Sequence, residues 1–240
     1  YDDEKFDIDR DELLQILPEK GIDYVVNVGA SLSSTKKTLE LAEKYNHVYA
    51  AVGVHPNETA ELNEENFICL SKMADKPKVV AIGEIGLDYY WKEPDPQVQK
   101  IWFERQMELA RQKKLPIIIH SRDAAKDTLD MIKASDGGSI GGVIHCFSYG
   151  VEIAKEYLDY LGIGGVVTFQ NARKLKEVVE YMPLDRMVLE TDCPYLAPVP
   201  NRGKRNSSMN LKYVAAQIAE LRKISEEEVI EATYQNAKRM

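Results

Sequence analysis

The sequence predicts an α/β protein with the architecture of a (β/α)8 TIM barrel. Two observations lead to this fold class: short β-branched runs alternate with longer amphipathic stretches, and those runs are almost continuously apolar. Runs of this kind are typical of strands buried on both faces, and such strands are parallel. Regular alternation of strands and helices leaves two architectures, an open doubly wound sheet and a closed barrel.

Seven apolar runs are expected to form strands. The first helix-like stretch, residues 9–17, precedes all of them, whereas in a (β/α)8 barrel each helix follows a strand. We therefore expect the first strand of the barrel to lie upstream of Tyr1. This count favours the barrel, and no GxGxxG or Walker sequence supports a nucleotide-binding open sheet. The runs cover residues 24–29, 48–54, 79–86, 116–120, 141–147, 162–169 and 187–191.

The stretches between the runs repeat apolar residues at helical spacing. Asp9 and Glu12 have the spacing of a capping box and predict the start of the first helix, and Ser225 with Glu228 predicts the start of the last. In the helices between them, we assign Cys69 to the core and Ile101 to the apolar face. These intervening helices are expected over residues 65–73, 98–114 and 212–221.

Composition limits the classes of protein that fit. The chain has 240 residues, of which 44% are hydrophobic and 29% charged. With no linker, internal repeat or low-complexity segment, we expect one domain over residues 1–240. The net charge of −8 excludes a surface that binds nucleic acid everywhere, although a local basic patch is compatible with it.

Cysteine usage and hydropathy predict a cytoplasmic protein. The three cysteines form no CxxC pair and follow no signal peptide, which indicates reduced thiols. No apolar run approaches the roughly 20 residues that span a membrane. Cys146 and Cys193 each adjoin a candidate metal ligand; packing is the expected role of both, with a soft-metal ligand or a nucleophilic Cys146–His145 pair as alternatives.

Titratable side chains gather where the expected strands end, and in a (β/α)8 barrel those ends carry the catalytic groups. A single histidine there is most simply a partly buried side chain with a local partner. Histidines and carboxylates at the same end of several strands need charge compensation together, and a metal ion supplies it. Imidazole and carboxylate suit zinc, manganese or magnesium. These residues are His55, Glu84, His120, His145, Glu190 and Asp192.

Five motifs together resemble the TatD family of metal-dependent deoxyribonucleases. They are "GEIGLDYY", "PIIIHSRDA", "HCFS", "ETDCPYLAP" and "RGKRN", and they occur in the family's order along the whole chain. The resemblance implies a (β/α)8 barrel related to the amidohydrolases, with two divalent ions at its mouth. It further implies cleavage of DNA phosphodiester bonds by a 3′→5′ exonuclease, on single-stranded DNA or at 3′ ends.

The resemblance also implies roles for single residues. Glu84 resembles the carboxylate that bridges the two metals, and His120 and His145 resemble ligands of the second metal. Asp192 resembles the aspartate that binds the first metal and handles the proton of the attacking water. His55, in "GVHP", resembles the histidine near the scissile phosphate.

Cationic and aromatic residues near these motifs are expected to contact the substrate. The loop "NRGKRN" follows the last proposed ligand and carries three cations. Tyr89, Tyr90 and Trp91 follow Glu84, and they suit either stacking on a base or packing of their own loop. The residues assigned to substrate binding are His55, Tyr90, Arg122, Arg202, Lys204, Arg205 and Asn206.

One departure from the family keeps two alternatives open. Many members begin with a strand ending in a His-x-His pair that holds the first metal; here the first residues, "YDDEKFD", resemble the segment directly after that pair. We expect the pair on the upstream strand. The alternatives are an amidohydrolase or lactonase acting on a small ester or amide, and a metal-free barrel that serves as a binding module.

Overall fold

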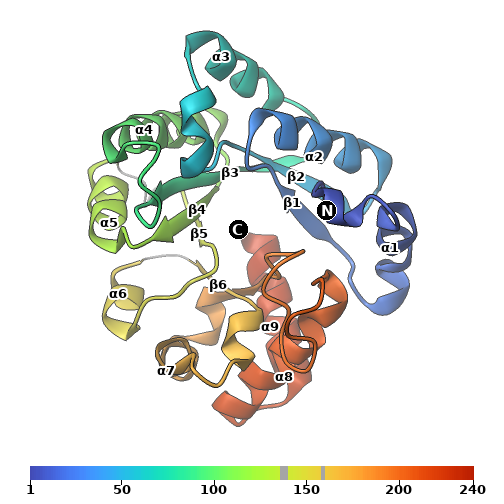
Figure 1. The fold of residues 1–240 in the computed structure, drawn as a ribbon. Coiled ribbons are helices and arrows are strands. Elements are labelled where there is room, and N and C mark those ends of the chain that lie inside the picture. The colour runs from blue at the N-terminus through green and yellow to red at the C-terminus, as the bar shows by residue number, and fades with distance from the viewer. Residues whose placement is uncertain (136–139, 158–159) are drawn as a thin grey trace. The chain divides into compact units, whose positions relative to one another are not determined.

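The computed structural model of the chain describes residues 1–135, 140–157 and 160–240 (Figure 1). They form two compact units, Tyr1–Gly142 and Val143–Met240. Within each unit, parallel strands pair in sequence order, and helices separate them along the chain. The predicted α/β class with parallel strands is therefore confirmed. The prediction of one domain over residues 1–240 stays a prediction.

The first unit is built around four parallel strands. β1 pairs with β2, β2 with β3 and β3 with β4, and each crossover between consecutive strands contains a helix. The register of the last pair places Gly86 beside His120 and Asp88 beside Arg122. The strands are β1 (Val25–Val28), β2 (Val48–Val52), β3 (Val79–Asp88) and β4 (Ile117–Arg122).

Helices of the first unit pack their apolar sides on these strands. α2 contacts β1 and β2, and α4 contacts β3 (Figure 1). α4 buries Trp102, Phe103 and Leu109, so the stripe of apolar residues read from the sequence coincides only in part with the packed side. The helices are α1 (Arg10–Ile16), α2 (Leu32–Lys44), α3 (Glu64–Met73), α4 (Pro96–Lys113) and α5 (Ala125–Ala134).

The second unit contains three shorter parallel strands. β5 pairs with β6 and β6 with β7, and α9 packs on β7. The buried Asn236 of α9 donates from Nδ2 to the carbonyls of Leu184 and Met187, which fixes this helix to the start of β7. The elements are β5 (Gly142–Ile144), α6 (Val151–Glu156), β6 (Tyr160–Ile163), α7 (Arg173–Tyr181), β7 (Met187–Leu189), α8 (Leu211–Arg222) and α9 (Glu226–Arg239).

The strand predicted over residues 162–169 is wrong in its second half. β6 ends at Ile163, and Gly165–Thr168 forms a 3₁₀ helix. The hydroxyl of Thr168 donates to the Gly165 carbonyl at 2.7 Å and accepts from the backbone N–H of Val199. Such side-chain bonds give the backbone an alternative to the strand ladder, and they outweigh the β-branched composition of this segment.

Three details of the helices also differ from expectation. Asp9 makes no side-chain capping bond at α1, whereas Ser225 caps α9 by accepting from the Glu228 N–H as predicted. Cys69 is exposed, and Ile101 is 56% exposed, so neither lies in the core. Helical spacing identifies a stripe of apolar residues, but the width of the packed stripe depends on which neighbours cover it.

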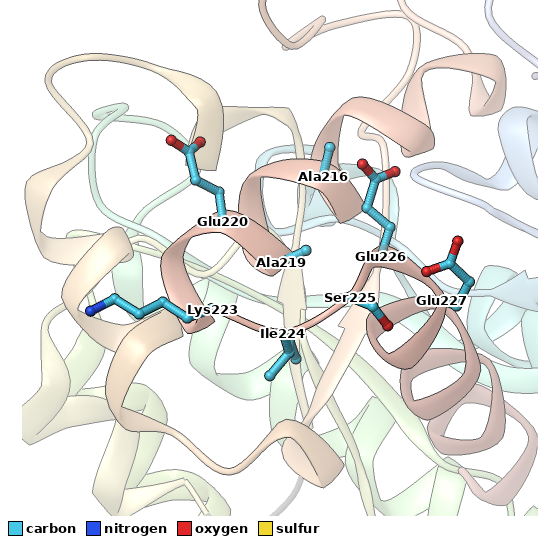
Figure 2. Close-up of a pocket in the computed structure, with 8 residues that line it drawn as sticks. All are labelled: Ala216, Ala219, Glu220, Lys223, Ile224, Ser225, Glu226 and Glu227. Carbon is cyan, nitrogen blue, oxygen red and sulfur yellow. The ribbon is translucent and has the colours of Figure 1, made fainter.

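A surface pocket of the second unit lies at the turn between α8 and α9, and no residue predicted as a site lines it (Figure 2). Its lining residues are Ala216, Ala219, Glu220, Lys223, Ile224, Ser225, Glu226 and Glu227. Among the described residues, no helix has both the length and the apolar composition needed to cross a membrane.

Candidate functional site

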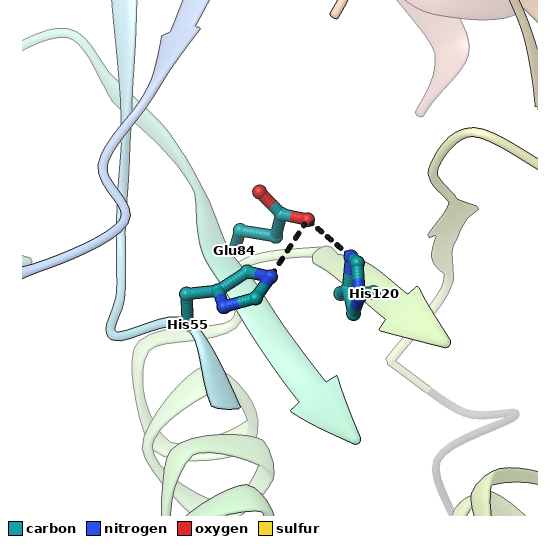
Figure 3. Close-up of side chains that lie close together, drawn as sticks. All are labelled: His55, Glu84 and His120. Atoms are coloured by element: carbon teal, nitrogen blue, oxygen red, sulfur yellow. Dashed lines mark hydrogen bonds and ion pairs between the residues drawn. The ribbon is translucent and has the colours of Figure 1, made fainter. Parts of the chain in front are cut away.

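The first unit brings together His55, Glu84 and His120 (Figure 3). Nδ1 of His120 lies 2.9 Å from Oε1 of Glu84, and Nε2 of His55 lies 3.8 Å from the same oxygen. Each of the three side chains offers one potential metal-ligand atom, and these three atoms all lie within 4.8 Å of one another. The side chains are only 15–18% exposed, so this is a partly buried cluster of metal-ligating groups.

Neighbouring strands position two members of this cluster, and a short helix positions the third. Glu84 lies on β3 and His120 on β4. Gly86 allows the two strands to approach, because a Cβ at this residue, which has φ of 141°, would lie 2.0 Å from the His120 carbonyl oxygen. His55 precedes the 3₁₀ helix Pro56–Glu61, and its Nδ1 accepts the backbone N–H of Asn57 at 3.1 Å.

Asp88 joins this cluster from the end of β3, and sequence reasoning missed it. Its Oδ2 lies 3.1 Å from Nε2 of His120, and the residue is 1% exposed. Burial disfavours the charged carboxylate, but hydrogen bonds from His120 and from the Tyr90 N–H outweigh burial and lower the pKa of Asp88. A usable signal was present, because residues 84 and 88 of one strand lie on the same face.

The second unit brings together His145, Cys146 and Asp192. Nε2 of His145 lies 3.6 Å from Oδ1 of Asp192, and its Nδ1 lies 2.6 Å from Oε2 of Glu190. Cys146 and Asp192 have φ of 46° and 54°, uncommon values for residues with a side chain. Such backbone conformations concentrate at functional sites, where surrounding contacts hold them.

Glu190 sits in a space that two glycines of the neighbouring segment leave open. A Cβ at Gly162 would lie 2.9 Å from Oε2 of Glu190, and a Cβ at Gly164 would lie 2.9 Å from Oε1. Oε2 accepts the backbone N–H of Cys146 at 3.1 Å, besides facing His145. Oε1 is buried and has no hydrogen-bond partner, which is costly for a carboxylate.

The chemistry of both clusters fits a divalent cation. In each unit a histidine nitrogen faces a carboxylate while its other ring nitrogen faces a second carboxylate. Each cluster therefore concentrates negative charge around imidazole, and a cation compensates for it. Imidazole and carboxylate suit zinc or manganese, and Cys146 adds a soft donor to the second cluster.

The four predicted metal ligands therefore occur as two pairs, with Glu84 and His120 in the first unit and His145 and Asp192 in the second. His55, predicted to act at the phosphate, lies in the first cluster. The roles assigned to these residues stay predictions.

Aromatic residues that follow β3 and the cationic last residue of β4 form a surface cluster. Tyr90 and Trp91 are 55% and 54% exposed, and their rings meet edge to face at 5.0 Å. The guanidinium of Arg122 lies 3.8 Å from the centre of the Tyr90 ring. Tyr89 differs, because its hydroxyl donates to Asp127 at 2.8 Å. Tyr90, Trp91 and Arg122 thus present flat, partly exposed groups near Asp88.

The predicted substrate loop of the second unit divides into exposed and buried residues. Arg202, Lys204 and Arg205 are exposed, and the Arg202 guanidinium lies 4.4 Å from the ring centre of Phe169. Asn206 is 1% exposed; its Nδ2 donates to the Thr191 carbonyl, and its Oδ1 accepts from Ser207 and Asn210. This network fixes the loop beside Asp192, and substrate contact by Asn206 stays a prediction.

The parallel strands and the two clusters of histidine and acidic side chains define an α/β protein with candidate metal-binding groups. A family model described as "TatD related DNase" matches residues 1–240. The chain therefore belongs to this family, as the resemblance of its motifs predicted.

Curated relatives and a solved structure agree with this assignment. The uncharacterized metal-dependent hydrolase YabD of Bacillus subtilis is 42% identical over 99% of this chain and 94% of that protein. The 3′-5′ ssDNA/RNA exonuclease TatD of Cronobacter turicensis is 34% identical over 98% and 93%. The crystal structure of the TatD homologue YJJV from Escherichia coli K12 has a TM-score of 0.91, with 30% identity over 98% of this chain and 92% of that one. This likeness confirms the predicted TIM-barrel fold class.

Proposed function

We propose that the protein is a metal-dependent hydrolase that cleaves DNA phosphodiester bonds and removes nucleotides from 3′ ends. The observation that carries the proposal is the convergence of His55 and His120 on one oxygen of Glu84. The name of the Cronobacter turicensis relative, which is an exonuclease for single-stranded DNA and RNA, supports this substrate class. We expect a cytoplasmic enzyme.

Two divalent ions, Mg²⁺, Mn²⁺ or Zn²⁺, are the proposed cofactors. Bound ions of this kind lower the pKa of water and neutralise charge that develops on phosphate oxygens. Glu84 would bind through its carboxylate in the first unit together with His120, and His145 and Asp192 would bind in the second. Strands hold such ligands more rigidly than loops do, which favours their placement on or within three residues after β3, β4, β5 and β7.

His55 is suited to donate a hydrogen bond to the substrate. Its Nδ1 accepts the Asn57 N–H, so the neutral ring carries its proton on Nε2. That nitrogen points to the side where Glu84 and His120 lie (Figure 3). A donor there can hold a phosphate oxygen or pass a proton to the leaving oxygen.

Asp192 is the proposed acceptor of the water proton. Its side chain is 35% exposed, more than those of the neighbouring His145 and Glu190, so water reaches it. Its Oδ1 lies 3.6 Å from Nε2 of His145, so this partly exposed carboxylate borders the cluster. A carboxylate at the border of a metal-binding cluster can orient a water molecule and accept its proton.

Substrate contacts are proposed at two surface groups, one in each unit. In the first, Arg122 and Tyr90 present a cation and a ring suited to a phosphate and an unpaired base. In the second, Arg202, Lys204 and Arg205 form an exposed cationic loop. Because the net charge is −8, binding is expected to be local. Contacts of these cations with phosphates should make binding weaken as the salt concentration rises.

The test is degradation of single-stranded DNA labelled at either the 3′ or the 5′ end, with and without Mg²⁺ or Mn²⁺. We expect metal-dependent shortening from the 3′ end, which Asp192→Asn abolishes. Asp185→Asn changes an exposed carboxylate of the same unit and should leave the rate unchanged. An RNA strand of the same sequence tests whether the sugar is discriminated.

The small-molecule alternative is tested with the same metal-loaded sample. A panel of lactones and simple esters or amides would reveal an amidohydrolase or lactonase. Hydrolysis of these compounds without DNA cleavage would contradict the nuclease proposal. Absence of bound metal by elemental analysis, together with no activation by added Mn²⁺, would favour a binding module instead.

A further inference from the structure

We propose that Asp88 and Glu190 are positioning residues that determine which ring nitrogen of each neighbouring histidine binds metal. Asp88 leaves Nδ1 of His120 for the metal, and Glu190 leaves Nε2 of His145. This inference rests on the proposed function, since it assumes that both histidines are metal ligands. It adds to that function the roles of Asp88 and Glu190, and it names the metal-binding nitrogen of each histidine.

The contacts of Asp88 determine the orientation of His120. Oδ1 of Asp88 accepts the Tyr90 N–H at 2.9 Å, and Oδ2 lies 3.1 Å from Nε2 of His120. An ionised carboxylate only accepts hydrogen bonds, and each ring nitrogen of His120 faces one, so the single proton of the neutral ring can serve only one of them. We place this proton on Nε2, because a cation held by Glu84 and His120 takes the lone pair of Nδ1, which faces Glu84 at 2.9 Å. A lone pair beside a carboxylate oxygen is the arrangement that two ligands of one cation require.

At His145, the contacts of Glu190 place the ring proton on Nδ1 instead of Nε2. Its Oε2 lies 2.6 Å from Nδ1 and also accepts the Cys146 N–H, so Nδ1 is the donor here. Nε2 keeps the lone pair and faces Asp192 at 3.6 Å. Gly162 and Gly164 leave room for Glu190, because a Cβ at either position would lie 2.9 Å from one of its carboxylate oxygens.

Burial separates the positioning carboxylates from the ligand carboxylates. The Asp88 side chain is 2% exposed against 16% for Glu84, and that of Glu190 is 17% exposed against 35% for Asp192. In each pair the more buried carboxylate holds the ring proton, and the more open one lies on the side that solvent and ions reach. Partners of this kind fix the tautomer and raise the basicity of a metal-binding histidine.

A neutral amide in place of Asp88 should change which ring nitrogen of His120 carries the proton. In Asp88→Asn, the amide oxygen can remain the acceptor for Tyr90 while its NH₂ donates to Nε2 of His120. The ring proton then moves to Nδ1, where it bonds to Glu84 and removes the lone pair that binds metal. Glu190→Gln should act in the same way, with its NH₂ donating to Nδ1 of His145.

The experiment uses the full chain labelled with ¹⁵N-histidine and loaded with ¹¹³Cd²⁺. The chain has four histidines, so each ring is assigned by a single substitution. We expect cadmium–nitrogen scalar coupling at Nδ1 of His120 and at Nε2 of His145. Coupling at the opposite nitrogen of either ring would overturn the inference while leaving the metal site intact.

Affinity for Zn²⁺ provides the second measurement. Loss of such a hydrogen-bonded partner typically weakens metal binding by about 10–100-fold, which we expect for Asp88→Asn and for Glu190→Gln. The controls are Glu104→Gln and Asp185→Asn, exposed carboxylates of the first and second unit. Unchanged affinity in both test variants would contradict the positioning role. If the wild type binds no divalent ion, the proposed function fails together with this inference; metal bound as described without hydrolysis refutes the function alone.

Discussion

Oε1 of Glu84 lies 2.9 Å from Nδ1 of His120 on the neighbouring strand. The parallel register explains the approach, because it places Gly86 beside His120 and Glu84 two residues before Gly86 on the same face of β3. Both side chains are less than one-fifth exposed. The strands thus bring a carboxylate and an imidazole together in a partly buried position. The attraction between these groups and a cation is stronger there than in water, because less solvent screens it.

Metal binding should stabilise the folded chain, and Glu84→Gln should reduce that effect. A ligand that binds only the folded state stabilises it by about 2.7 kcal/mol at 100 times its dissociation constant. We expect Mn²⁺ or Zn²⁺ to raise the Tm of the wild type and EDTA to reverse the change. Scanning calorimetry should show a smaller rise for Glu84→Gln and a normal one for Glu104→Gln. An equal rise in all three proteins would remove Glu84 from the ligand set.

Gly164→Ala should displace Glu190 and lower hydrolytic activity. The added Cβ would lie 2.9 Å from Oε1 of Glu190, closer than real Cβ contacts allow. We expect kcat to fall at least about tenfold, as it does when partners of metal ligands are lost. Gly150→Ala is the matched control, because its Cβ meets no atom within 4 Å. Equal activity of the two variants would show that Glu190 is free to shift without consequence.

Strand composition made most of the parallel architecture predictable, whereas single contacts depended on the fold. The run ending in His120 forms β4, and Glu84 lies on β3 as predicted. Asp88 shares the strand face of Glu84, but the sequence does not show that Asp88 contacts His120. The partners of a buried carboxylate come from other strands, so they emerge only when the register is known.

Local patterns failed where a tertiary contact competed with them. Residues 165–168 have strand composition, but the Thr168 hydroxyl bonds to the Gly165 carbonyl and to Val199, which comes from a distant part of the sequence. Cys69 has the hydropathy of a core residue, yet α3 presents it to solvent. Hydropathy reports the tendency to be buried, and the packing of neighbouring elements decides which faces are covered.

Arg122→Gln should weaken binding of single-stranded DNA and reduce its dependence on salt. One phosphate contact contributes about 0.7 to the slope of log K against log salt concentration for single strands. We expect a loss of about that size, measured by fluorescence anisotropy in the inactive Asp192→Asn background. Arg111→Gln, at an arginine paired with Glu108 on α4, should keep the wild-type slope. The same slope for both variants would exclude a phosphate contact at Arg122.

Trp91→Ala should weaken binding through the loss of base stacking. The ring is 54% exposed and meets Tyr90 edge to face, so one surface of it is open to a base. Stacking contributes about 1–3 kcal/mol per base, which predicts a Kd at least about fivefold higher. An oligonucleotide that lacks the stacked base should bind the wild type and the Trp91→Ala variant with equal Kd. Tyr181→Ala, at an equally exposed aromatic residue of the second unit, serves as the control. A Kd that does not change with Trp91→Ala would assign this ring to packing of its own loop.

Asp127→Asn should lower stability near neutral pH but have little effect in acid. Asp127 accepts from Lys100 at 2.6 Å and from the Tyr89 hydroxyl at 2.8 Å, which joins α5 to α4 and to the end of β3. Hydrogen bonds from Lys100 and then Tyr89 lower the pKa of Asp127 below its ordinary value of 3.8. A carboxyl group with a lowered folded-state pKa stabilises the protein above its unfolded-state pKa, and this contribution is lost as pH falls through the folded-state value.

Because the Asp127 side chain is 34% exposed, solvent screens its charge, and we expect a loss of about 0.3–1 kcal/mol at pH 7. Urea unfolding of wild type and variant should show this difference shrinking as pH falls below about 4, near the ordinary carboxyl pKa. Asp185→Asn, at an exposed carboxylate of the second unit, should match the wild type at every pH. A difference that stays constant from neutral pH into acid would mean that Asp127 stabilises the fold through packing, since packing does not depend on its charge.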